Sequence, residues 1–163
     1  MHTSTKYKSA ANNVTSLGSV VPKQLVEDTT KALSKLKVAL GGDVSGYVAC
    51  RLHMNMTELK DALAAEQVDG VALAMYNIEK KAQSVIIGDQ TGFGKGRQAA
   101  AMIRYGLLSG YLPVFFTDRY TLFSDMYRDC KALGIKDARP LVLGRYMHRL
   151  KRPLNYRDHF QFL

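Results

Sequence analysis

Residues 88–98 combine glycines with a lysine in a pattern that suits phosphate binding. They read Gly-Asp-Gln-Thr-Gly-Phe-Gly-Lys-Gly-Arg-Gln, and they lie between an apolar, β-branched run at 84–87 and a stretch with helical apolar spacing. Glycines let backbone N–H groups approach phosphate oxygens, a helix N-terminus adds positive potential, and lysine supplies a mobile cation. The pattern therefore predicts a phosphate-binding loop between a buried strand and a helix.

This loop differs at two positions from the common P-loop pattern G-x-x-x-x-G-K-[ST]. Asp89 stands where the first glycine is expected, and Gly96 replaces the hydroxyl residue that normally contacts Mg²⁺. That contact is therefore lost, or is supplied by Asp89 or water. Without its flanking elements, Gly-Phe-Gly-Lys suits an ordinary hairpin or helix cap equally well. The candidate nucleotide contacts in the loop are Asp89, Thr91, Gly92, Phe93, Gly94, Lys95, Gly96 and Arg97.

Three segments of the chain carry a family resemblance. Residues 88–97 resemble motif I of the strawberry-notch-like branch of superfamily 2 helicases, which has Gly-Lys-Gly-Arg where most relatives have Gly-Lys-Thr. Residues 65–69 are similar to that family's adenine-reading glutamine motif, and residues 112–118 to its second strand and motif Ia. With weaker similarity toward the N-terminus, the resemblance covers residues 7–143.

The resemblance implies an ATP- and Mg²⁺-dependent DNA helicase or translocase. The branch includes large phage and plasmid proteins, some of them linked to antirestriction. It implies that Gln67 reads adenine and that Thr117 and Arg119 contact a nucleic-acid strand. The residues themselves leave alternatives: Gln67 as an exposed residue at a helix start, Thr117 as a helix cap and Arg119 as a solvated charge. Arg97 equally suits a phosphate contact and a surface arginine.

The acids that ATP hydrolysis requires are not recognisable after the loop. Helicases of this type place adjacent acids after a buried strand, and arginines of a second domain complete the site. The only adjacent pair, Glu27 and Asp28, lies in a predicted helix before the loop. We therefore expect the first part of a motor, inactive alone, whose partner is the remainder of that motor. Two alternatives stay open: a non-catalytic interaction or nucleic-acid-binding protein with a remnant loop, and a small P-loop kinase.

Composition and apolar spacing divide the chain into four parts. We expect a mobile polar arm over 1–21, a helical segment over 22–81, a partial RecA-like P-loop core over 82–143 and a basic, aromatic tail over 144–163. The predicted fold class is α/β, with a parallel sheet that follows the helical segment.

Local signals also predict particular elements within these parts. Apolar runs indicate strands at 84–87, 112–116 and 141–143. Asp43 and Thr57 are predicted to cap two of the helices that precede the loop.

Positive charge points to a polyanionic partner. The net charge is +9, from 23 basic and 14 acidic residues, which suits nucleotide or nucleic acid but also an ordinary solvated surface. Basic residues alternate with aromatic residues over 144–163, a pattern that suits phosphate contacts and base stacking. Its alternative is a disordered or amphipathic tail, or sequence outside the family. The candidate nucleic-acid contacts in the tail are Arg145, Arg149, Lys151 and Arg152.

The sequence shows no signal for membrane insertion or secretion, and none for a metal site. No apolar run approaches the ~20 residues of a membrane span, and the N-terminus does not resemble a signal peptide, so we expect a cytoplasmic protein. The histidines and cysteines show no metal-ligand spacing.

Overall fold

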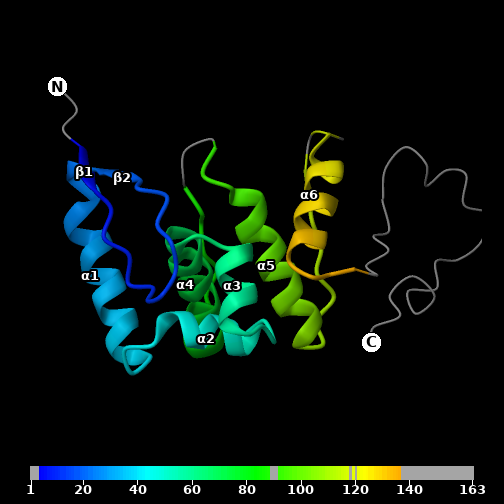
Figure 1. The fold of residues 1–163 in the computed structure, drawn as a ribbon, viewed down its shortest axis with the longest axis horizontal. Helices are drawn as coiled ribbons and strands as arrows, with labels where there is room; N and C mark the ends of the chain where they lie inside the picture. Colours follow the sequence, from blue (N-terminus) through cyan, green and yellow to red (C-terminus); the bar gives the residue numbers. More distant parts are fainter. Residues whose placement is uncertain (1–3, 89–91, 118, 120, 137–163) are drawn as a thin grey trace, which may run out of the picture.

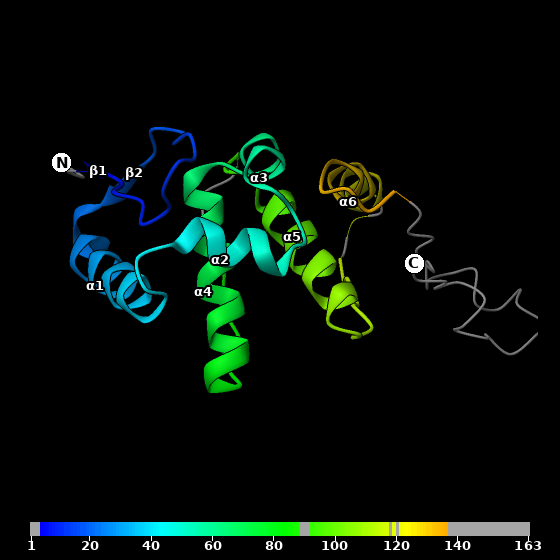
Figure 2. The same ribbon diagram turned by 60° about the horizontal axis from the view of Figure 1, so that its bottom comes forward.

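Helices form most of the regular structure in the computed structural model of the chain, which describes residues 4–88, 92–117, 119 and 121–136 (Figure 1). Helices α1, α4, α5 and α6 follow one another across the molecule, and α2 crosses α4 (Figure 2). In chain order the elements are β1 (Ser4–Lys6), β2 (Val20–Pro22), α1 (Lys23–Ala39), α2 (Val44–Arg51), α3 (Met56–Ala62), α4 (Ala65–Lys81), α5 (Lys95–Leu108) and α6 (Thr121–Ala132).

The core lies where α2 and α5 pack against α4, and α3 packs against α2. Apolar residues recur along α4 at helical spacing, and this face is fully covered because helices pack on it from several sides. None of the described helices is long and apolar enough to cross a membrane. The completely buried side chains of this core include Val44, Val48, Leu52, Leu59, Val68, Val71, Met75, Ala100 and Ala101.

Helix caps follow the sequence signals closely, with one shift. Asp43 caps α2 as predicted, since its carboxylate accepts a hydrogen bond from the backbone N–H of Gly46 at 2.8 Å. The predicted Thr57 cap of α3 is wrong. Asn55 takes that position, and Glu58 accepts the Asn55 N–H at 2.8 Å to complete a capping box. Asn55 is the better cap because a glutamate, not a lysine, lies three residues after it.

A single arginine ties α5 to the ends of two other helices. The Arg104 guanidinium donates hydrogen bonds to the carbonyls of Leu52 and Leu133, each at 2.6 Å, and to that of His53 at 3.2 Å. Helix C-termini present unpaired carbonyls and negative potential, so an arginine suits this position. Burial lowers the pKa of Arg104. The bonds fix α6 beside α5 independently of the loop at the other end of α5.

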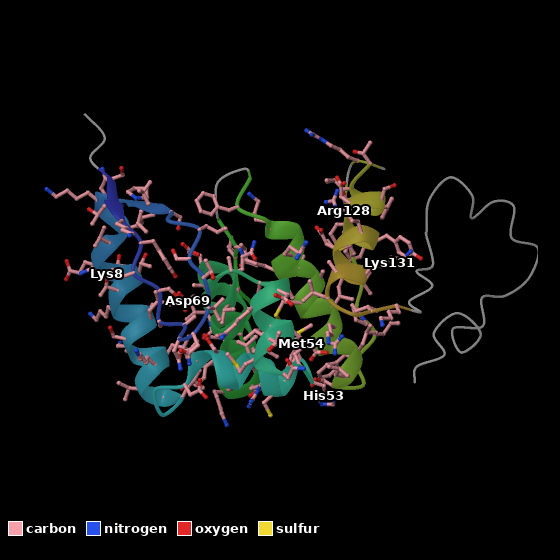
Figure 3. All side chains as sticks on the ribbon, viewed as in Figure 1. Lys8, His53, Met54, Asp69, Arg128 and Lys131 are labelled. Atoms are coloured by element: carbon pink, nitrogen blue, oxygen red, sulfur yellow. The ribbon has the colours of Figure 1, made fainter. Side chains whose placement is uncertain are left out.

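The N-terminal segment is held against α4 rather than forming the free arm that its composition favours. Strands β1 and β2 pair antiparallel with Thr5 opposite Val21. Between them, the backbone N–H groups of Ala10 and Ala11 donate to the buried carboxylate of Asp69 at 3.1 and 3.0 Å. Figure 3 labels Asp69 where α4 meets this segment. A buried acceptor on the neighbouring helix, which polar composition does not reveal, holds the segment in place.

The expected parallel sheet is not observed among the described residues. Segments 84–87 and 112–116 belong to neither helix nor strand, and Ile86 and Phe116 are 94% and 88% exposed. A parallel strand requires a hydrogen-bonded neighbour and cover on both faces, and an apolar run supplies neither by itself. The third predicted strand, 141–143, lies outside the described residues.

Candidate phosphate-binding site

The described part of the glycine-rich loop forms a turn that opens a helix. Gly92 and Gly94 have φ of +96° and +72°, and Gly94 is the N-cap of α5, with its carbonyl accepting from the Arg97 N–H at 2.9 Å. Lys95 is the first residue of the helix and is exposed. The first N–H groups of a helix have no intrahelical acceptor and attract anions. Asp89 and Thr91 lie outside the described residues.

Gln67 holds this turn in place. Its side chain is 7% exposed, and its Nε2 donates to the carbonyl of Phe93 at 3.0 Å while its Oε1 accepts from the Ala64 N–H at 3.0 Å. A Cβ at Gly94 would lie 2.3 Å from Nε2, so the amide contacts the loop backbone directly. Gln67 is not the exposed helix-start residue of the alternative interpretation. A glutamine amide has two donors and two acceptor lone pairs, so one of each stays available.

Arg97 is directed toward helices α3 and α6. Its Nη1 donates to the carbonyl of Ala62 at 2.8 Å, and its Nε lies 3.6 Å from Oδ1 of Asp129. The side chain therefore connects the first turn of α5 to the end of α3 and the last turn of α6. Its predicted contact with phosphate stays a prediction.

Gly96 makes room for an acidic residue of α6. A Cβ at this position would lie 2.2 Å from Oδ2 of Asp129, whose side chain is largely buried. The described residues contain no cluster of three metal-ligating side chains. A carboxylate oxygen is nevertheless the type of ligand that Mg²⁺ prefers, and this one occupies the space of the missing side chain. The residues beside the loop therefore fit a magnesium nucleotide.

The acids on either side of Gln67 anchor the N-terminal segment. Glu66 accepts hydrogen bonds from the Ser16 hydroxyl at 2.6 Å and the Leu17 N–H at 2.9 Å. Burial raises the pKa of Glu66, but these hydrogen bonds outweigh it, and the net shift is downward. For Asp69, burial prevails over its hydrogen bonds and raises the pKa. Sequence reasoning missed both roles; the available signal was two acids three residues apart near the start of an amphipathic helix, with Glu66 in its first turn.

A pocket of about 380 Å³ adjoins this turn. It lies between the N-terminal segment and the end of α3, and two predicted nucleotide contacts, Gln67 and Arg97, line it. Its position next to the loop suits the base or sugar of a nucleotide whose phosphates lie at α5. The other lining residues are Thr15, Ser16, Leu17, Lys60, Asp61, Ala62, Leu63 and Ala64.

A slightly larger pocket, of about 410 Å³, lies at the other end of α4. The Glu79 carboxylate in its wall accepts hydrogen bonds from Arg51 Nη2 at 2.8 Å, the Tyr47 hydroxyl at 3.1 Å and the Tyr105 hydroxyl at 3.2 Å. Its charges are thus paired within the chain, and the glycine-rich loop is not part of it. The smaller pocket is therefore the better candidate for a nucleotide.

The predicted nucleic-acid contacts are only partly within the described residues. The Thr117 hydroxyl accepts a hydrogen bond from the Arg119 N–H at 3.2 Å in the turn that precedes α6. Because α6 begins only at Thr121, this local bond does not cap the helix, and the nucleic-acid role of Thr117 and Arg119 stays a prediction. Arg145, Arg149, Lys151 and Arg152 lie outside the described residues.

Comparison with known families agrees with the loop. A family model described as P-loop containing NTP hydrolase pore-1 matches residues 21–155, which is 135 of the 163 residues. Comparisons with curated proteins and with solved structures gave no match. The match includes helices α1 to α6 as well as the loop, so it does not rest on the glycine pattern alone. The chain therefore belongs to the P-loop containing NTP hydrolase pore-1 family.

Proposed function

We propose that the chain binds ATP as the first part of a motor of the superfamily 2 helicase type. The observation that carries this proposal is the turn at Gly94, which opens α5 with Lys95 exposed beside it. The backbone has positive φ at Gly92 and Gly94, and the Gln67 amide stabilises the turn by a hydrogen bond to the Phe93 carbonyl. A preformed turn of this kind binds phosphate with little ordering cost.

Adenine is the proposed base, with the pocket beside Gln67 as its site. The amide of Gln67 keeps one N–H and one lone pair beyond its bonds to Phe93 and Ala64. This combination complements the donor and acceptor edge of adenine, as the resemblance of residues 65–69 to the glutamine motif implies. Lys60 and Asp61 add charged side chains to the same pocket wall.

DNA is the proposed substrate of the complete motor. The support is the resemblance of residues 112–118 to motif Ia, together with the net charge of +9. The same resemblance favours a phage or plasmid protein involved in DNA processing or antirestriction. A second function, nucleic-acid binding with a non-catalytic loop, is favoured by Gly96, since the loop lacks the hydroxyl that normally contacts Mg²⁺.

Removal of the loop cation tests nucleotide binding. Lys95→Ala is expected to weaken ATP binding about ten- to hundredfold, because a charge-assisted contact contributes roughly 1.5–3 kcal/mol. Lys35→Ala on the exposed side of α1 is the control and should leave affinity unchanged. Calorimetric titration with ATP measures both variants. Equal affinity of Lys95→Ala and the wild type would exclude phosphate binding by this loop.

Removal of the Gln67 amide tests the choice of base. Gln67→Ala releases the Phe93 carbonyl, so it should weaken ATP and GTP alike through the loop. Loss of base reading should weaken ATP further, so the ratio of ATP to GTP affinity should fall. Titrations with both nucleotides separate the two effects. An unchanged ratio would show that Gln67 serves the loop alone.

A further inference from the structure

The space beside Gly96 is occupied by an atom from another helix. In the common pattern this position carries a serine or threonine whose hydroxyl contacts Mg²⁺. In this chain, Oδ2 of Asp129 lies 2.2 Å from where the first side-chain carbon would be. One oxygen has thus been removed from the loop, and another oxygen lies in the same space.

The two oxygens of Asp129 have different surroundings. Among the described residues, the donors that reach this carboxylate contact Oδ1: two nitrogens of Arg128 at 3.4 Å and, beyond hydrogen-bond distance, Arg97 Nε at 3.6 Å. These contacts are long, and the Arg128 side chain is largely exposed (Figure 3). Oδ2 is directed at the first turn of α5 instead.

Contacts other than this carboxylate also hold α6 in place. Met126, Cys130 and Leu133 bury the apolar face of the helix, and Arg104 holds the Leu133 carbonyl at 2.6 Å. Asp129 is nevertheless 7% exposed. Burial of a carboxylate is costly unless it has a partner; here the arginines reach Oδ1 at 3.4 and 3.6 Å, whereas Oδ2 faces the first turn of α5. An acid placed in this way beside a phosphate loop is well suited to a cation that arrives with the ligand.

We propose that Asp129 replaces the missing hydroxyl of the loop as an oxygen ligand for the Mg²⁺ of the bound nucleotide. This rests on the proposed nucleotide binding at Gly94 and Lys95. Mg²⁺ is bound in proteins by one or two carboxylates together with substrate phosphates, and Asp129 supplies one such carboxylate from α6. The role belongs to an acid that follows no apolar strand, which is why the sequence did not reveal it.

The dependence of ATP affinity on Mg²⁺ tests this role. The wild type is expected to bind ATP more tightly with Mg²⁺ than with a chelator. Asp129→Asn should keep the affinity measured in chelator and lose roughly tenfold or more of the affinity measured with Mg²⁺. Asp125→Asn is the matched control, because it removes an acid from the same helix that is half exposed and pairs with Arg128. Calorimetry gives the affinities, and thermal unfolding confirms that both variants fold.

A hydroxyl returned to the loop should rescue the loss. In an Asp129→Ala background, Gly96→Ser places a hydroxyl in the vacated space and should restore the Mg²⁺ dependence. Mn²⁺ binding in the presence of ADP, followed by electron paramagnetic resonance, provides a readout of the metal itself and should fall in Asp129→Asn. Both results would support the ligand role.

Three outcomes would overturn the proposal. One is a wild type that binds ATP equally with and without Mg²⁺, and this would leave the proposed nucleotide binding intact. Another is an Asp129→Asn variant with the same Mg²⁺ dependence as Asp125→Asn. The third is equal weakening with Mg²⁺ and with chelator, which would assign Asp129 to positioning Arg97. Absence of all ATP binding by the wild type would instead overturn the proposed function, and this inference with it.

Discussion

Two glycines of the loop have the same backbone conformation but different surroundings. Gly92 and Gly94 both have positive φ, yet a Cβ at Gly92 meets no atom of the described residues within 4 Å, whereas one at Gly94 would lie 2.3 Å from Nε2 of Gln67. The first position therefore requires glycine for its dihedral angle alone. The second requires it also because the amide that holds the loop lies against its Cα.

Alanine substitutions should separate these two constraints. Gly92→Ala is expected to lower stability by about 1–2 kcal/mol through left-handed strain. Gly94→Ala should cost more and also weaken ATP binding, because the amide must leave the Phe93 carbonyl to make room. Denaturant unfolding and ATP titration measure the two effects. In a Gln67→Ala background the extra cost of Gly94→Ala should disappear; its persistence would contradict this explanation.

The sequence was sufficient to identify several residues of the candidate site, but not the contacts that these residues make with other helices. The glycines, Lys95 and Gln67 were identifiable because their spacing along the chain is itself the signal. Asp129 was not, since its importance comes from packing of α6 against Gly96, and nothing local to either residue indicates that contact. The hydrogen bond from Arg97 to the carbonyl of Ala62 was not predictable either, because it depends on where α3 ends.

Helix α3 begins where a reciprocal pair of hydrogen bonds can form. The side chains of Asn55 and Glu58 each accept a hydrogen bond from the backbone N–H of the other residue, so the N-cap lies two residues before the predicted cap at Thr57. Asn55→Ala is expected to destabilise the protein by about 1 kcal/mol. Thr57→Ala is the control and should have little effect because its side chain does not cap the helix. Chemical unfolding of both variants tests this; equal losses would contradict the assignment.

Helices and strands differ in how far a local pattern determines them. Helical spacing predicted the positions of α1, α4 and α5 because an α-helix satisfies its own backbone hydrogen bonds. The runs at 84–87 and 112–116 have strand-like composition, but they have no ladder partner in the described chain. A strand is a property of at least two segments, so composition alone could not decide its formation.

The charge of the molecule is distributed unevenly along the sequence. Residues 144–163 hold five basic residues and one acid, a local net charge of +4. This concentration is independent of the phosphate loop, so nucleotide and nucleic-acid binding should be separable. By contrast, acidic residues bind the N-terminal segment: Glu66 and Asp69 of α4 accept hydrogen bonds from its backbone.

Salt dependence tests whether this charge binds nucleic acid. If four phosphates are neutralised, the slope of log affinity against log salt for single-stranded DNA should be about −3. Replacement of Arg145, Arg149, Lys151 and Arg152 by alanine in the full chain should reduce this slope and leave ATP affinity unchanged. Binding of labelled DNA over a salt series measures it. An unchanged slope would move the interface toward Thr117 and Arg119.

The contact between position 96 and Asp129 also has a consequence for how the family varies. Any side chain at position 96 displaces the carboxylate, because a Cβ there lies 2.2 Å from Oδ2. A substitution at position 96 should therefore change which residues are tolerated at position 129. Relatives with serine or threonine at position 96 are expected to have lost the acid at 129, and relatives with glycine to have kept it. Independent variation of the two positions across an alignment would show that they evolve separately.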